Sequence, residues 1–314
     1  MKKIYLIFLL PFFAVSQNSN DLVVYLDSLE QIANEDNYYV LRVMKDYYSE
    51  NPGCLVYDFY KSGEKKSIGK YTDKYNLLKA GEYISYYENG NKSSLFHFDN
   101  NQPIGKFYTW YEKGNIKSEG EFIQFKNTEK SILKVNHYWS RIGIHRVIDG
   151  KGHYEDEGIT WYSEGELLNG LQDGDWTGFD VVNKSSFTEK YKAGILISGI
   201  SIDSLKKTYQ YKEIEELTNP KVKKVKFYKY LKNNIKIPAY IIQNKLSGAL
   251  EVSFTINKEG WITNTKVSYG MGYGLEAEII RVFNNSDQWN PAKKRGIPYE
   301  SQLTIPFSIY NGKL

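Results

Sequence analysis

The sequence contains few of the residues from which disulfides and metal sites are built. Cys54 is the only cysteine, and there are only four histidines among 314 residues. One cysteine excludes an internal disulfide, so the folded domains must be stabilised by their cores. Cys54 follows the turn signal Asn51-Pro52-Gly53. We interpret it as a small, partly buried residue at the start of a strand, with a reactive thiol as the alternative.

The motifs of common enzymes and cofactor sites are also missing. No two histidines have ligand spacing, and no GxSxG nucleophile motif occurs. Gly270-Met-Gly272-Tyr-Gly274 has the wrong spacing for a dinucleotide fingerprint. Asp173-Gly-Asp175 lacks the downstream glutamate of a calcium loop, and we interpret it as a β-turn. The sequence therefore predicts a protein that is not an enzyme, with no catalytic residues, no cofactor and no metal.

The excess of positive charge is small. The net charge is +4, and Lys2 and Lys3 contribute two of these charges, so a chain without them carries +2. A nucleic-acid-binding domain normally has a strong basic excess. Nucleic acid is therefore not an expected partner.

The longest apolar run is too short for a membrane span. It covers Ile4 to Val15, whereas a transmembrane helix needs about 20 apolar residues. Small residues at Ala14 and Ser16 favour cleavage before Gln17. We therefore predict a signal peptide over residues 1–16, an exported chain and no integral membrane span after cleavage. An uncleaved anchor is the alternative, and no cysteine follows that would carry a lipid.

Aromatic residues are abundant and recur with a regular pattern. The chain has 28 Tyr, 15 Phe and 6 Trp, which favour strands. The segment from Gly81 to Gly90 resembles the one from Gly105 to Gly114, with a period of 24 residues, and looser copies end at Gly63 and Gly165. Each copy has aromatics, a two-residue spacer and a glycine, which is typical of a β-hairpin with a tight turn. We expect the hairpins to stack edge to edge in an extended antiparallel sheet, with most rings in packing roles.

These units resemble the MORN-type repeats of the YwqK antitoxin-like family, most closely over residues 55–125 and more loosely to residue 179. The resemblance implies a fold more than an activity. Before the repeats, Leu22, Leu26, Leu29 and Ala33 have helical spacing. We take residues 38–48 as the first strand of the sheet.

The aromatic rhythm stops near residue 212, and a basic segment follows. From Lys221 to Lys232 the apolar residues recur at a helical period, and most of the six lysines fall on the opposite face. The expected apolar stripe consists of Val222, Val225, Tyr228, Leu231 and Ile235. We predict an amphipathic helix packed on the next domain, with a solvated lysine face; contact with anionic lipid or peptidoglycan is the alternative. No long Pro-rich spacer is present.

The last 79 residues, 236–314, have the pattern of a small α+β domain. Leu250, Val252, Phe254 and Ile256 alternate with polar residues, and a turn ends at Gly260. A helix is expected over Leu275–Phe283 and a final strand over Gln302–Tyr310.

This region resembles the TonB C-terminal domain. The resemblance rests on Gly248, Phe254 and Gly260, the turn from Gly270 to Leu275, Trp289-Asn-Pro291-Ala292, Arg295-Gly296-Ile-Pro298 and Ile305-Pro306-Phe307. It implies a helix packed on a small antiparallel sheet with an open edge, to which a segment of an outer-membrane transporter is added as a strand. Two features depart from the family pattern: Ile237-Pro238 replaces a common Tyr-Pro, and no membrane anchor is expected after cleavage of the signal peptide.

The resemblance places the partner beside the final strand. The expected partner-binding residues are Gln302, Leu303, Thr304, Ile305, Phe307, Ser308, Ile309 and Tyr310. The expected partner is a protein or an extended peptide, such as a segment of an outer-membrane transporter. Open strand edges also favour a homodimer, and the oligomeric state stays open.

The expected fold class is β-rich α+β, with an extended antiparallel sheet of stacked hairpins before a two-layer α+β domain. We divide the chain into a signal peptide (1–16), a repeat domain (17–212), a linker with a basic helix (213–235) and the C-terminal domain (236–314). The expected location is the periplasm or exported cell envelope of a Gram-negative bacterium. The first functional hypothesis is peptide binding by strand addition. The alternative is a repeat-based scaffold or a neutralising partner of the antitoxin type, without a role in energy transduction.

Overall fold

The computed structural model describes residues 20–28, 30–124 and 131–313. The predicted signal peptide and its cleavage site lie outside these ranges. The chain divides into two compact units, one comprising the residues up to Tyr154 with Leu167–Leu171, the other Glu155–Glu166 with Gln172–Leu314.

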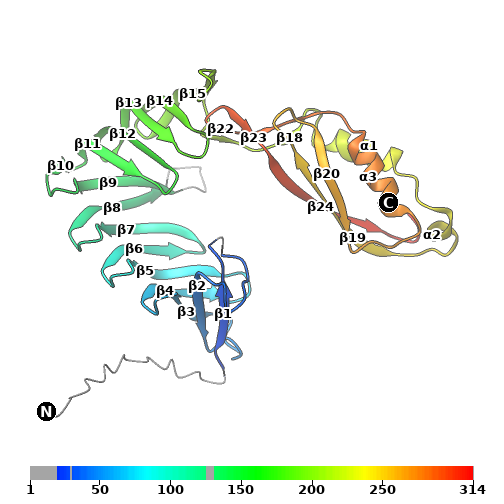
Figure 1. Ribbon diagram of the computed structural model, residues 1–314, viewed down its shortest axis with the longest axis horizontal. Helices are drawn as coiled ribbons and strands as arrows, with labels where there is room; N and C mark the ends of the chain where they lie inside the picture. The colour runs from blue at the N-terminus through cyan, green and yellow to red at the C-terminus, as the bar shows by residue number, and fades with distance from the viewer. Residues whose placement is uncertain (1–19, 29, 125–130, 314) are drawn as a thin grey trace, which may run out of the picture. The chain divides into compact units, whose positions relative to one another are not determined.

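The first sixteen strands form one antiparallel sheet in which they follow each other in chain order, as Figure 1 shows. Their bounds are β1 Leu22–Leu26, β2 Val40–Lys45, β3 Cys54–Tyr60, β4 Lys65–Asp73, β5 Leu78–Tyr86, β6 Lys92–Asp99, β7 Gln102–Trp110, β8 Ile116–Gln124, β9 Ser131–Trp139, β10 His145–Ile148, β11 Lys151–Glu157, β12 Trp161–Leu168, β13 Leu171–Asp180, β14 Ser185–Lys192, β15 Ile195–Ile202 and β16 Thr208–Tyr211. The predicted sheet of hairpins is confirmed.

The remaining elements contain all three helices of the described residues. They are β17 Glu215–Glu216, β18 Asn219–Pro220, α1 Lys224–Asn234, α2 Ala239–Gln243, β19 Gly248–Ile256, β20 Ile262–Ser268, α3 Leu275–Asn284, β21 Trp289–Asn290, β22 Ala292–Lys294, β23 Ile297–Tyr299 and β24 Ser301–Ile309. Strands β20, β19 and β24 form a three-stranded sheet in that order. The small α+β domain expected after the repeats is confirmed.

The repeated glycines close the hairpin turns, as predicted. Gly90 and Gly114 have φ angles of 84° and 89°, in the left-handed region that favours glycine. In each turn the glycine N–H donates to the carbonyl of the residue three positions earlier, Tyr87 at 2.9 Å and Tyr111 at 2.7 Å. The turn at Gly63 repeats this geometry.

Turn tyrosines link each hairpin to the next. The hydroxyl of Tyr60 donates to the carbonyl of Tyr86, that of Tyr87 to Trp110, and that of Tyr111 to Trp139, each at 2.8 Å. Every such bond satisfies a polar group at the rim of the sheet, and each contributes about 1 kcal/mol of net stability. The aromatic repeat is therefore a repeat of hydrogen bonds as well as of ring packing.

Two expectations about the sheet are wrong. Leu22 and Leu26 belong to β1 and not to a helix, because this Val-rich segment pairs with Val40–Met44 of β2. The segment predicted as the first strand is therefore the second. Gly165, expected at a hairpin turn, lies within β12, where the ring of Trp176 would come within 2.6 Å of an added Cβ.

The fourth turn of this kind lies instead at Gly143. Its N–H donates to the carbonyl of Ser140 at 2.8 Å, as the other turn glycines do. At the first position of this turn, Ser140 replaces the tyrosine of the other turns. The sequence pattern of an aromatic residue three positions before a glycine is therefore absent, and the turn was not predicted.

The C-terminal domain has the core that the sequence predicts. The four alternating residues of β19, from Leu250 to Ile256, are at most 2% exposed. Leu275, Ile279, Val282 and Phe283 of α3 are also buried, and the rings of Phe283 and Phe307 lie 5.8 Å apart. Helix α3 thus packs on the sheet formed by β20, β19 and β24.

Helix α1 forms within the predicted basic segment, but only part of the predicted apolar stripe is buried: Leu231 and Ile235 are buried, and Val222 packs partly on the core. Phe227 and Leu231 face the core, at 4% and 1% exposure, whereas Val225 is 79% and Tyr228 40% exposed. The ring of Phe227 packs against those of Phe283 and Trp289. The contact of Phe227 with these two rings determines which face of α1 packs on the core. Val225 and Tyr228 of the expected apolar stripe therefore face outward.

A buried charged cluster joins the last hairpin strands to the strand pair β22–β23 within the second unit. Arg295 Nε donates to Glu189 Oε1 at 2.8 Å, with side-chain exposures of 8% and 2%. The hydroxyls of Tyr191 and Tyr211 also donate to Glu189. Burial, followed by the charge of Glu189, raises the pKa of both tyrosines. Arg295 lies 3.8 Å from the ring centroid of Phe187.

Candidate functional site

The predicted partner-binding residues lie on one outer strand. Residues Gln302 to Ile309 belong to β24, and Tyr310 follows it directly. Within the described chain β24 pairs only with β19, over its whole length from Gly248↔Ile309 to Ile256↔Ser301. The other long edge of β24 therefore presents main-chain groups without a strand partner.

Side chains of β24 alternate between the core and the exterior. Phe307 and Ile309 are buried, and Leu303 and Ile305 pack partly against the same core. Gln302, Thr304 and Ser308 are exposed. The exposed positions alternate with Leu303, Ile305 and Phe307, so the strand is fixed on one face and open on the other.

A groove of about 390 Å³ lies along the middle of this strand. Leu303, Thr304, Ile305 and Pro306 form one wall. The remaining lining residues come from α1, β21 and the segment before α1: Thr218, Asn219, Pro220, Lys224, Phe227, Tyr228 and Trp289. The volume is within the range of roughly 300–1,000 Å³ that is usual for ligand pockets.

The wall opposite β24 is held by hydrogen bonds. Strand β18 pairs with β21, through Asn219↔Asn290 and Pro220↔Trp289. Thr218 Oγ1 donates to the carbonyl of Asn290 at 2.8 Å, and Asn290 Nδ2 donates to Asn219 Oδ1 at 2.9 Å. These bonds fix the backbone beside the groove.

The floor of the groove is aromatic, and its rim is basic. Phe227 and Trp289 are 4% and 5% exposed, with ring centroids 5.0 Å apart. Lys224, at the first turn of α1, lines the groove and is exposed. The sequence did not predict this groove. The lysine-rich helix was recognised, but which residues of α1 face the β24 edge depends on tertiary packing.

Other candidate groups do not form a site. Cys54 begins β3 and is buried, which raises the pKa of its thiol, so the structural interpretation of this residue is supported. Asp173 lies in β13 rather than in the expected β-turn, and accepts hydrogen bonds from Lys192 and the Ala193 N–H.

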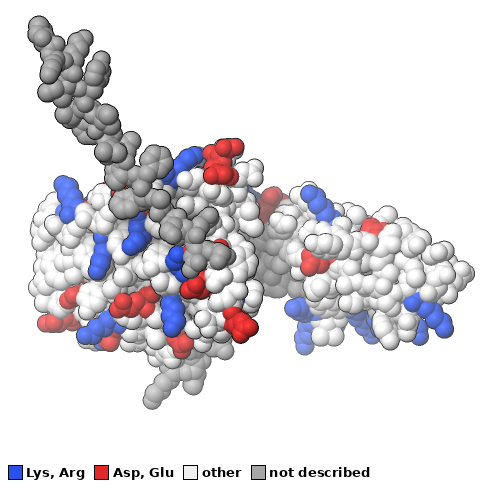
Figure 2. All heavy atoms as spheres, turned by 90° about the horizontal axis from the view of Figure 1, so that it is seen from below, with Lys and Arg blue, Asp and Glu red and all other residues white. Residues whose placement is uncertain are grey.

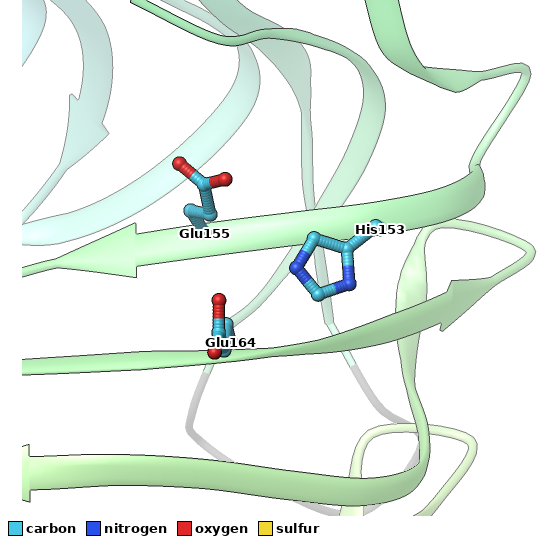
Figure 3. Close-up of side chains that lie close together, drawn as sticks. All are labelled: His153, Glu155 and Glu164. Carbon is cyan, nitrogen blue, oxygen red and sulfur yellow. The ribbon is translucent and has the colours of Figure 1, made fainter.

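One group of potential metal ligands occurs among the described residues. The candidate ligand atoms of His153, Glu155 and Glu164 lie within 4.8 Å of one another. Figure 3 shows the three side chains. The histidine count alone gave no sign of this grouping. The division between the two units falls between Tyr154 and Glu155, so we assign no site to this group.

Two further properties are the charge on one face of the hairpin sheet and the length of the helices in the described residues. On the face that Figure 2 shows, basic and acidic side chains are interspersed over the hairpin sheet. None of the helices in the described ranges is both long and apolar enough to cross a bilayer.

The C-terminal region thus has the architecture of a small two-layer α+β domain, in which an outer strand lies beside a groove. Residues 233–309 match the family described as Gram-negative bacterial TonB protein C-terminal. The resemblance inferred from the glycines, Trp289 and Pro306 is therefore confirmed for this region. No curated protein was found that matches the chain. The likeness of the hairpins to MORN-type repeats stays a prediction.

Proposed function

We propose that this is an exported, non-enzymatic interaction protein of the Gram-negative cell envelope. Its C-terminal domain binds an extended peptide by adding it as a strand to the outer edge of β24. The observation that carries the proposal is the position of β24, which has one strand partner and a groove along its middle. A segment of an outer-membrane transporter is the proposed partner, and the periplasm is the proposed location.

The chemistry of strand addition fits this edge. An added strand hydrogen-bonds to unpaired main-chain groups, and its alternate side chains enter adjacent pockets. Pro306 has no N–H, and proline in a sheet normally points its nitrogen away from the ladder. Its place in β24 therefore supports an outer edge at this residue.

A proline at Ser308 tests the proposal. Residues 306 and 308 are two apart, so their backbone nitrogens point the same way. Ser308→Pro should therefore remove one outer donor and leave the pairing with β19 in place. Ser308→Ala is the matched control, since it removes only the exposed hydroxyl.

The assay is titration of the full chain with synthetic peptides from the periplasmic segments of outer-membrane transporters. We expect binding by the parent and by Ser308→Ala, and loss of binding by Ser308→Pro with an unchanged melting temperature. Equal binding by the parent and both variants would show that capture does not use this edge.

The second candidate function is a repeat-based scaffold or neutralising partner. Lysine ammonium groups lie over ring faces along the sheet, Lys65 at 5.8 Å from Tyr57 and 5.6 Å from Tyr86, and Lys92 at 6.0 Å from Trp110. Such a surface offers charged and aromatic contacts to a protein. Partner capture that survives Ser308→Pro but is lost in Tyr86→Ala and Trp110→Ala would favour this candidate.

A further inference from the structure

We propose that His137 and His145 of the hairpin sheet bind a divalent transition-metal ion, with Cu²⁺ as the preferred ion. Both residues lie within the first unit, His137 on β9 and His145 on β10. Nδ1 of His137 and Nε2 of His145 face each other at 3.1 Å. The two histidines are separate from the three-residue group described above, and the inference is independent of strand addition at β24.

A β-bulge brings the two imidazoles to the same face of the sheet. His145 lies opposite Trp139 of β9, and the register shifts between His145 and Val147, so that Arg146 is the extra residue. In a regular strand His145 would point to the same side as Val147, which is fully buried. The bulge turns its ring instead to the face that carries Trp139 and His137. The two histidines are then diagonal neighbours across the strand pair.

The separation of the two nitrogens fits two ligands of a single ion. When each metal–nitrogen bond is about 2.0 Å long, two ligands at a right angle lie about 2.8 Å apart, and two at the tetrahedral angle about 3.3 Å apart. The observed 3.1 Å lies between these values. An ion can therefore replace the hydrogen bond between the rings with little movement of either side chain.

Both rings are held in place by neighbours. The rings of Trp139 and His145 are stacked, with centroids 4.3 Å apart and planes 12° from parallel. On the other side of the pair, Nε2 of His137 lies 3.7 Å from Asp149 Oδ1. A carboxylate beside this nitrogen favours a proton on it, which leaves the Nδ1 lone pair directed at His145. Asp149 is 88% exposed, so we assign it a role in orienting the ring only.

The charge beside the pair favours a cation. Glu119 of β8 lies directly opposite His137, and directly opposite residues share a face of the sheet. Lys134 lines the same hollow as His137 and Asp149, but its ammonium group is paired with Glu121 at 2.8 Å. The carboxylates of Glu119 and Asp149 therefore add negative charge beside the two imidazoles.

The ligand type selects the ion. Imidazole nitrogen suits Cu²⁺, Ni²⁺ and Zn²⁺, and Cu²⁺ binds most tightly in this series, whereas Mg²⁺ and Ca²⁺ prefer oxygen ligands. In the bound state each neutral ring keeps one proton, on Nε2 of His137 and on Nδ1 of His145. Two ligands from the chain leave the other positions of the ion to water or to a donor atom of a partner.

The sequence gave no sign of this site. The two histidines are eight residues apart, and a spacing of three or four on one helix is the familiar signal for a metal-binding pair. Here the ligands come from neighbouring strands, and the bulge that aligns them appears only in the folded sheet.

The test is calorimetric titration of the full chain, freed of metal by a chelator, with CuCl₂, ZnCl₂ or MgCl₂. We expect the parent to bind Cu²⁺ more tightly than Zn²⁺ and to give no binding signal with Mg²⁺. His137→Phe and His145→Phe keep a packed ring and remove the ligand nitrogen. Each should weaken Cu²⁺ binding at least about tenfold, because even the loss of a group that only orients a ligand costs about 10–100-fold.

A matched control separates this pair from the other histidines. His97 lies on β6 of the same sheet, where its ring contacts the Lys106 carbonyl and Glu82. His97→Phe should keep the Cu²⁺ affinity of the parent. His137→Leu and His145→Leu repeat the test where phenylalanine lowers the melting temperature.

A nuclear magnetic resonance measurement locates the ion. Cu²⁺ is paramagnetic, so it should broaden the indole N–H signal of Trp139, which is stacked on His145, at the lowest Cu²⁺ ratios, and His145→Phe should prevent this broadening. Equal Cu²⁺ affinity of the parent and both phenylalanine variants would overturn the inference. Loss of binding only in His97→Phe or His153→Phe would place the ion elsewhere and would also overturn it.

Discussion

Removal of the carboxylate of Glu189 is expected to destabilise the second unit strongly. Arg295 is held by this carboxylate at 2.8 Å, and the two side chains are 8% and 2% exposed. Glu189→Ala therefore leaves a buried guanidinium without its counter-charge, and two tyrosine hydroxyls without an acceptor. Breaking a buried pair by removing one partner costs about 3–5 kcal/mol.

This loss is large enough to measure by scanning calorimetry of the full chain. For a unit of this size, 1 kcal/mol shifts the melting temperature by roughly 2–4 °C, so Glu189→Ala should lower the transition by roughly 6–20 °C. The half-exposed pair Lys293–Glu216, which joins β22 to β17 at 3.0 Å, is the matched control. Glu216→Ala should cost about 1 kcal/mol or less.

A double variant shows whether the penalty comes from the unpaired charge. Glu189→Ala combined with Arg295→Met removes both charges, so it should be less destabilised than the sum of the two single variants. A melting temperature of Glu189→Ala within about 1 °C of the parent would refute the reasoning. A buried arginine without its counter-charge should lower the free energy of unfolding by much more than such a small shift implies.

Three other predictions follow from turns, charge and export. Gly114→Ala places a Cβ at a φ of 89°, and should cost about 1 kcal/mol in urea unfolding; a variant as stable as the parent would contradict the turn geometry. Arg281 lowers the pKa of Glu278 from 4.5 to about 2, so its contribution to stability is present above pH 4.5 and is lost as the pH falls toward 2. Glu278→Gln should therefore lose less stability than the parent over that interval, and equal losses would contradict this. Mass spectrometry of the exported chain should find Gln17 as the first residue, whereas an intact Met1 would favour an anchored protein.

The sequence predicted the features that local chemistry determines. A glycine three residues after a tyrosine specifies a tight turn, so Gly90 and Gly114 were placed correctly. Gly165 also stands three residues after a tyrosine, Tyr162, but it lies within β12 and is covered by the ring of Trp176. Trp176 belongs to a different strand, β13. Local spacing alone does not separate these two roles of glycine.

The C-terminal domain was predictable for the same reason, and its groove was not. Apolar and polar residues alternate strictly in β19, and the apolar residues of α3 recur at a helical spacing. Each pattern specifies one buried face, and the apolar residues of both elements are buried. Helix α1 contains apolar residues on two faces, and the choice between Phe227 and Tyr228 depends on Trp289 and Phe283. A groove formed by residues from 218–228, residue 289 and residues 303–306 is visible only in the folded chain.

The most direct test of strand addition is hydrogen exchange at the amides of β24 in the full chain, with and without a bound transporter peptide. An added strand pairs with main-chain groups on the outer edge, so amides of β24 that point away from β19 should exchange more slowly with peptide present. The amides of β20, at the opposite edge of the same sheet, should be unchanged. Slower exchange confined to the hairpin sheet, with β24 unaffected, would contradict the account and favour the scaffold function.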